Sequence, residues 1–236
     1  MADLSFQCLG VAADIYAAGP TLNIRLRVTE RSGAKVHAIA LRAQLRIEPQ
    51  KRRYSPTEAA NLGDLFGATT RWADTLRPLQ FATVPAMVPG FSDSCDFDLP
   101  VPCTYDLEIA ATTYFHALDE GDIPLMLLFS GTVFTKGETG FSVAPVSWQA
   151  EAPCLVPIGV WREMMDRFFP NCGWIRLSRD TLQTLGAFKN RRAIPTWEQA
   201  ITTLLDEVAG IDELPGPDQV PGLAGTPDRT EARETA

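Results

Sequence analysis

The sequence predicts a mainly β protein of the α+β class: an antiparallel β-sandwich with an inserted short helix and a C-terminal helical segment. Apolar and polar residues alternate through the first two-thirds of the chain, and turn residues separate the alternating segments. After residue 153 the apolar spacing becomes helical. We therefore expect a sandwich over residues 1–153, a helical segment docked on it over 154–209, and a disordered acidic Pro/Gly-rich tail over 210–236.

Residues 21–29 and 39–47 are the clearest strands. In the first, Leu22, Ile24, Leu26 and Val28 alternate with polar residues, and the second shows the same period of two. The turn residues Ser32-Gly33 stand between them. We expect the two strands to pair as a long hairpin with one solvated face.

Further elements follow in order along the chain. Ser55-Pro-Thr-Glu58 has the composition of a helix start with a capping box, and this inserted helix should end near Gly67. Strand patterns then cover residues 79–88, 95–101, 105–118, 125–135 and 141–148. About seven strands separated by turns are typical of a sandwich, and no alternation of strands with helices indicates a parallel sheet.

Helical spacing marks the last third. Apolar residues from Ile158 to Phe169 recur with a helical period that Pro170 stops. Ser178 is placed to cap a second helix, and Thr196 with Gln199 to begin a third. These helices are too short to be stable alone, so we expect them to dock on the sandwich or on each other.

Composition excludes several function classes. The chain has 236 residues and a formal net charge of -8, which argues against nonspecific binding to nucleic acid or to anionic membranes. The longest apolar run, residues 123–129, is too short for a transmembrane segment. The five cysteines are widely spaced and form no CxxC pair, and the N-terminal residues lack signal-peptide features. We therefore expect a reduced cytoplasmic protein whose cysteines are mostly small core residues.

A basic stretch stands out in this acidic chain. Between Arg25 and Arg53 there are nine basic residues against two acidic ones. On the predicted hairpin these side chains would form an interaction surface for an acidic partner, although an ordinary solvated sheet face explains them as well. The surface residues are Arg25, Arg27, Arg42, Arg46, Lys51, Arg52 and Arg53.

Other candidate sites are weaker. His116 precedes Asp119, Glu120 and Asp122, so an imidazole and three carboxylates could share one loop end and bind a cation; an acidic solvated turn is the simpler interpretation. Cys103 has no neighbouring positive charge to activate its thiol, which favours a buried core role. No dinucleotide, phosphate-loop or hydrolase motif is present, and we predict no catalytic residue, cofactor or metal.

Several segments together resemble an uncharacterised bacterial family of unknown function, over roughly residues 4–208. The genes of this family lie among those for a high-affinity, oxygen-tolerant NiFe hydrogenase. The resemblance implies an accessory, maturation or assembly role, and it transfers no catalytic or ligand residue. The segments are Arg25–Glu30, Val36–Arg42, Arg46–Gln50, Met87–Phe91, Leu99–Asp106, Ile123–Phe134 and Pro195–Trp197.

We therefore predict a non-enzymatic accessory protein that binds a protein partner, a hydrogenase subunit or maturation factor being the candidate. One alternative is a ligand- or metal-binding module with a cleft lined by Trp161, Trp174 and Trp197, although such residues are more often plain core. Another is an enzyme with a dispersed site around His116 and Cys103. Self-association is left open.

Overall fold

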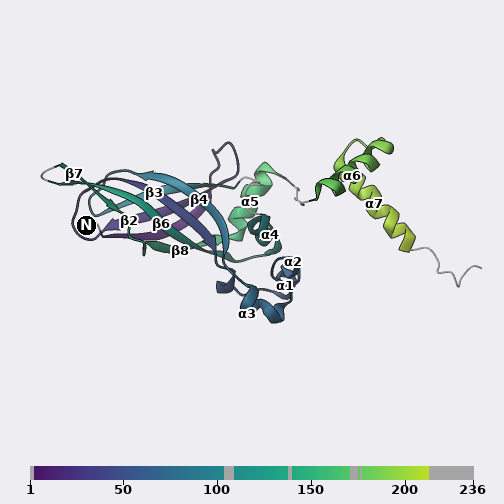
Figure 1. Cartoon of the computed structure of the whole chain (residues 1–236), viewed down its shortest axis with the longest axis horizontal. Coiled ribbons are helices and arrows are strands. Elements are labelled where there is room, and N and C mark those ends of the chain that lie inside the picture. The colour runs from purple at the N-terminus through teal and green to yellow at the C-terminus, as the bar shows by residue number, and fades with distance from the viewer. Residues whose placement is uncertain (1–2, 104–108, 138–139, 171–174, 176, 213–236) are drawn as a thin grey trace, which may run out of the picture. The chain divides into compact units, whose positions relative to one another are not determined.

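The computed structural model contains two antiparallel sheets that pack face to face (Figure 1). It describes residues 3–103, 109–137, 140–170, 175 and 177–212. The smaller sheet has the order β1-β2-β5, and the larger has the order β4-β3-β6-β7 with β8 also paired to β6. The predicted sandwich is thus confirmed. The strands are β1 (Leu4–Ala13), β2 (Thr21–Glu30), β3 (Val36–Ile47), β4 (Leu79–Val88), β5 (Ser94–Pro102), β6 (Asp122–Gly137), β7 (Gly140–Pro145) and β8 (Glu151–Pro157).

The predicted hairpin between β2 and β3 is wrong. β2 pairs with β1 and β5, whereas β3 pairs with β4 and β6, so the chain crosses from one sheet to the other between them. The buried carboxylate of Glu30 stabilises this crossing, because it accepts hydrogen bonds from the amides of Asp3, Ser32 and Ala34 and from the Ser32 hydroxyl. A period of two reveals which face of a strand is buried, but it does not identify the neighbouring strand.

The long strand β6 organises the larger sheet. Along one edge it pairs with β3, and along the other it pairs first with β8 and then with β7. Gly131 lies between these two partners with φ +141°. A Cβ at this position would collide with the carbonyl oxygen of Ala40 on β3, so the close approach of the strands requires glycine.

The core lies between the sheets, and two contacts illustrate how they are joined. The rings of Phe6 and Phe129 stack with centroids 4.1 Å apart. Cys8 on β1 and Cys154 on β8 form a disulfide with a Cα–Cα distance of 5.5 Å. The prediction of reduced cysteines is therefore wrong for this pair, whose bond links the edge of one sheet to the edge of the other.

Helices α1 to α5 gather at one end of the sandwich (Figure 1). The predicted strand over residues 105–118 is wrong where the structure describes it, because residues 109–117 form α4; residues 105–108 lie outside the described residues. Ala111, Tyr114, Phe115 and Leu118 are buried with helical spacing. The helices and helical turns are η1 (Pro49–Lys51), α1 (Pro56–Asn61), α2 (Gly63–Phe66), η2 (Thr69–Arg71), α3 (Trp72–Thr75), α4 (Ile109–Ala117), α5 (Ile158–Phe168), α6 (Arg179–Arg191) and α7 (Trp197–Asp212).

The chain forms two compact units, residues 1–172 and residues 173–236. The first unit therefore includes β8, which continues to Pro157, and α5, whose buried side chains pack into the sandwich core. The second unit contains α6, capped by Ser178, and α7, which extends three residues beyond position 209. Residues 213–236 of the predicted tail lie outside the described residues. No helix in the described part of the chain has the length and apolarity needed to cross a membrane.

Candidate functional site

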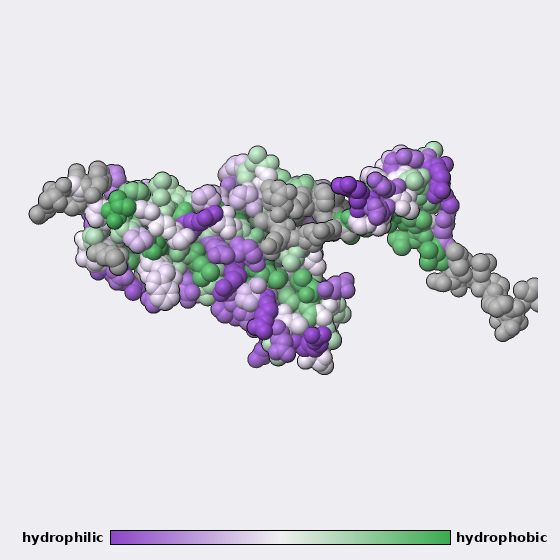
Figure 2. Space-filling model, viewed as in Figure 1, coloured by the Kyte–Doolittle hydropathy of each residue, from purple (hydrophilic) through white to green (hydrophobic). Residues whose placement is uncertain are grey.

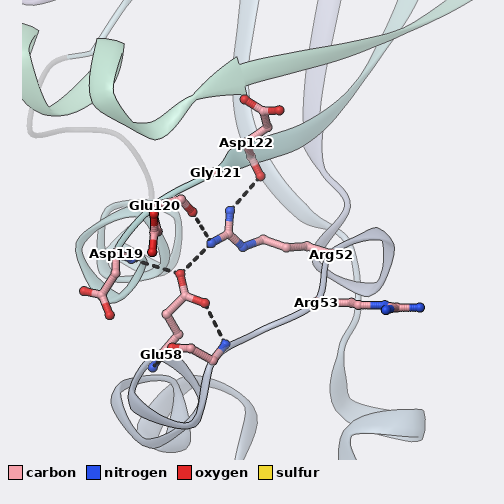
Figure 3. Close-up of a pocket in the computed structure, with 8 residues that line it drawn as sticks. Arg52, Arg53, Glu58, Asp119, Glu120, Gly121 and Asp122 are labelled. Carbon is pink, nitrogen blue, oxygen red and sulfur yellow. Dashed lines mark hydrogen bonds and ion pairs between the residues drawn. The ribbon is translucent and has the colours of Figure 1, made fainter.

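A polar pocket of about 480 Å³ brings together two groups that the sequence presented separately (Figure 3). Arg52 and Arg53 come from the predicted basic surface, and they meet the acidic loop that follows α4. His116 does not line the pocket. The lining residues are Arg52, Arg53, Ser55, Glu58, Asp119, Glu120, Gly121 and Asp122.

The start of α1 positions the buried carboxylate of this pocket. The Glu58 amide donates to Ser55 Oγ at 3.1 Å, and the Ser55 amide donates back to Glu58 Oε2 at 2.9 Å. This is the predicted capping box, which satisfies two amides at the helix start. The other oxygen, Oε1, accepts from the amide of Asp119 at 2.9 Å, so it links α1 to a loop 61 residues away.

Arg52 completes this arrangement from the opposite side. Its side chain is 9% exposed, and Nη2 donates to Glu58 Oε1 at 2.5 Å. Nη1 donates to the carbonyl oxygen of Asp122 at 2.8 Å, and Nη2 donates to that of Glu120 at 2.5 Å. Its Nε atom is buried without a partner among the described residues. The guanidinium therefore joins three segments: its own, α1 and the acidic loop.

A second arginine holds the same loop from α5. Arg162 Nη1 donates to the carbonyl oxygen of Asp119 at 2.6 Å, and Nη2 donates to that of Leu118. The amide of Ile158 donates to the carbonyl oxygen of Gly121 at 2.9 Å. With the two carbonyls bound by Arg52, every carbonyl in this five-residue loop has a partner. Two arginines therefore provide four of the five hydrogen bonds that these carbonyls accept, which hold the loop in this conformation.

Electrostatics show that the Arg52–Glu58 pair is structural. Burial alone would raise the pKa of Glu58, but the amides of Ser55 and Asp119 and the charge of Arg52 outweigh it and lower the pKa. A carboxylate whose pKa is lowered and whose two oxygens both accept hydrogen bonds is a weak general base. The pair therefore stabilises the pocket wall, and the exposed rim carries the remaining charge.

The predicted cluster of His116 with three acidic residues is not assembled as a metal site. His116 lies on α4 with its ring edge-on to Trp161, the centroids being 4.9 Å apart. Burial lowers the pKa of His116, and the charge of Arg162 lowers it further. Among the described residues, no group of three or more His, Cys, Asp and Glu side chains could hold a metal ion.

The other candidate residues, Cys103 and the three tryptophans, do not form a site among the described residues. Cys103 is buried, and its burial raises the pKa of the thiol to about 12, so the reactive thiolate is not formed near neutral pH. Trp161 is buried in the first unit, whereas Trp197 lies on α7 of the second unit. Trp174 lies outside the described residues.

The basic residues of β2 lie on the outer face of the smaller sheet, where acidic residues of β5 face them. Arg27 forms two hydrogen bonds with Asp96, at 2.6 and 2.8 Å, and Arg25 lies 3.4 Å from Asp98. The pairs stand directly opposite each other in the register of the two strands. The hydrogen bond from Arg27 is the main cause of the lowered pKa of Asp96. This part of the predicted surface is largely neutralised.

The basic residues of β3 lie on the outer face of the larger sheet, and their environments differ. Arg46 Nε donates to the buried carboxylate of Glu48 at 2.8 Å, and Lys51 lies 3.8 Å from the same carboxylate. Arg42 is exposed and forms no ion pair or side-chain hydrogen bond within the described part of the chain. The predicted basic surface is thus divided between the outer faces of two different sheets. Arg42 lies on the outer face of the larger sheet without an ion-pair partner among the described residues.

Apolar and polar side chains surround Arg42 on this outer face, the polar ones including Gln44 and Thr83. Pro85 lies opposite it on β4 and Ser130 on β6, while Met87, two pairs further along β4, is 68% exposed. The sequence placed Arg42 outward by alternation, but its cross-strand neighbours follow from strand order, which the sequence did not reveal. We call this surface the Arg42 face; it consists of Ala40, Arg42, Gln44, Pro85, Met87, Leu128 and Ser130.

Fold and surface together define a β-sandwich module with a helical appendage and an outward sheet face of mixed apolar and cationic character. The chain belongs to the Family of unknown function (DUF6084), whose model matches residues 1–212. No curated protein matches the chain. Among solved structures, β-glucosidase 3B from Thermotoga neapolitana in complex with α-D-glucose is 11% identical, with a TM-score of 0.22 over 64% of this chain and 16% of that chain. A similarity this low carries no argument about function.

Proposed function

We propose that this chain is a non-enzymatic accessory protein that assists the maturation or assembly of another protein by binding it through the Arg42 face. The observation that supports this proposal is an exposed, unpaired arginine in the middle of an outward face containing Met87, Pro85 and Leu128. The proposed partner is a NiFe hydrogenase subunit or maturation factor. That choice rests on the resemblance to proteins encoded beside hydrogenase genes.

The chemistry of the Arg42 face suits a protein partner. Arginine and methionine are enriched at protein interfaces, where apolar contact supplies area and a charge supplies orientation. A sheet face is too flat to enclose a small ligand. Because Arg42 forms no ion pair within the described part of the chain, a partner that offers a carboxylate between apolar side chains gains an ion pair without breaking another.

Co-purification from a host that carries the hydrogenase genes tests this proposal. We expect the wild-type chain to recover a hydrogenase subunit or maturation factor, and Arg42→Glu combined with Met87→Glu to reduce recovery at least tenfold. Both side chains point outward, so the core is not changed. Arg25→Glu is the matched control, because it reverses an exposed arginine on the opposite outer face, and it should recover the partner normally.

Two outcomes would reject the proposal. Equal recovery by the Arg42 face variant and the Arg25 control would show that this face does not bind the partner. Recovery of no hydrogenase-related protein, together with normal hydrogenase activity in a deletion strain, would remove the hydrogenase role itself.

The proposed compartment is the cytoplasm, and the cysteines provide its test. A disulfide between Cys8 and Cys154 weighs against this compartment, because reducing conditions keep most such pairs as thiols. Trapping thiols with a maleimide in intact cells, followed by mass spectrometry, decides the question. A cytoplasmic chain should carry the label on both residues, whereas an unlabelled pair would indicate an oxidising compartment.

A further inference from the structure

The α6–α7 unit has no hydrophobic core of its own. Among its described residues, Ala200 alone is buried. Four large apolar side chains on the two helices are exposed: Leu182 (47%), Trp197 (47%), Leu205 (64%) and Val208 (58%). Two helices of 13 and 16 residues do not bury enough apolar area to be stable alone. Another surface must therefore cover them.

Contacts between the two helices occupy one side of the pair. Gly186 on α6 allows the Trp197 ring to approach closely, and Lys189 lies 5.6 Å from the centre of the same ring. Arg192 and Glu207 form an ion pair across the two helices. These contacts leave the α7 residues Leu205 and Val208 uncovered, and Figure 2 shows hydrophobic residues gathered over α7.

The charges of the two helices are opposite in sign. On α6, Arg179, Lys189 and Arg191 outnumber Asp180, and Arg192 follows as the C-terminal cap. On α7 the charged residues are all acidic and include Glu198, Asp206 and Glu207. A two-fold symmetric interface uses the same patch from both partners, so each patch must complement itself. A basic helix beside an acidic helix, with an apolar stripe between them, meets that requirement.

We propose that the α6–α7 unit binds the same unit of a second copy of this chain. The two hairpins form a four-helix bundle in which α6 of one copy lies beside α7 of the other. Leu205 and Val208 become buried at the centre of the bundle, and the basic and acidic helices face each other at its rim. Dimerisation uses the second unit and leaves the Arg42 face of the first unit available, so it is independent of the proposed accessory role.

The mass of the full chain in solution tests this proposal. Light scattering after size exclusion, with sedimentation equilibrium, should give twice the chain mass of 25.8 kDa for the wild type. Leu205→Glu combined with Val208→Glu should give the monomer mass, with a dimer dissociation constant raised at least 100-fold. Both residues are exposed in the single chain, so the sandwich should melt at an unchanged temperature. Met87→Glu, an equally exposed site on the Arg42 face, should remain dimeric.

Charge exchange gives a second, independent measurement. The first double variant, Arg179→Glu with Arg191→Glu, makes both helices acidic. The second, Glu198→Lys with Asp206→Lys, makes the two helices together predominantly basic. Both leave the Arg192–Glu207 ion pair intact. Each variant alone should be monomeric, and an equimolar mixture should form a heterodimer.

Several results would overturn the proposal. The first is a wild-type chain that stays monomeric at 100 µM, whether or not the Glu substitutions lower the melting temperature of the sandwich. The second is a dimer that survives Leu205→Glu with Val208→Glu. The third is a mixture of the two charge variants that remains monomeric.

Discussion

Replacing Arg52 with methionine tests whether the buried ion pair holds the pocket together. Methionine preserves the apolar stem of the side chain but leaves Glu58, 3% exposed, without its counter-charge. It also removes the donors to the carbonyls of Glu120 and Asp122. Removing one partner of a buried pair typically costs about 3–5 kcal/mol. Two backbone amides still bind the Glu58 carboxylate, so we expect a loss of about 3 kcal/mol, near the lower end.

Urea denaturation at pH 7 measures this loss, and the neighbouring residue supplies the control. Arg53 is exposed and forms no ion pair or side-chain hydrogen bond among the described residues, so Arg53→Met should change the free energy of unfolding by less than about 0.5 kcal/mol. The folded-state pKa of Glu58 lies below its unfolded value of 4.5, so its contribution is present above that pH and lost as the pH falls. The cost of Arg52→Met should therefore shrink below pH 4.5. Equal urea midpoints for the two methionine variants at pH 7 would refute this reasoning.

Two further predictions concern the sandwich. Burial would raise the pKa of Glu30, but the Ser32 hydroxyl and three backbone amides lower it to about 2. Glu30→Gln should therefore lower the free energy of unfolding by about 2 kcal/mol at pH 7, after allowance for screening, and by progressively less from pH 4.5 towards 2. A difference from wild type that is constant with pH would contradict this prediction. The Cys8–Cys154 disulfide closes a loop of 146 residues, so Cys8→Ser should lower the free energy of unfolding by about 2–4 kcal/mol. Dithiothreitol should then destabilise the wild type but not the variant, and an equal response of both would exclude this role.

Local sequence patterns predicted the helices and strands better than they predicted which strands pair with one another. The capping box at Ser55 and Glu58 formed as expected, because its two hydrogen bonds join residues three positions apart. β8 was not predicted, because its residues cross the expected end of the sandwich at residue 153; it is an edge strand whose prolines occupy exposed positions while Ala152 and Val156 are buried. Strand order depends on contacts between distant residues, which alternation does not encode.

The pocket could be predicted only in part for the same reason. The sequence indicated that Glu58 would bind Ser55, but it contained no signal that the second carboxylate oxygen would accept from Asp119. Nor did it distinguish Arg52 from Arg53, although one is nearly buried and the other exposed. The difference arises because two segments 68 residues apart meet at one end of the sandwich.

Charge counted along the chain differs from charge available to a partner, and this difference determines how the two proposed surfaces work together. Five of the seven predicted surface cations are in ion pairs, which leaves two without one among the described residues: Arg53 at the pocket and Arg42 on the outer sheet face beside Pro85. A dimer formed through α6 and α7 would present two copies of the Arg42 face. Linked sites bind a partner with two matching surfaces more tightly than either site alone, provided that the linkage can span them. We therefore expect the Leu205→Glu and Val208→Glu monomer to retain the Arg42 contact and to lose affinity selectively for dimeric partners.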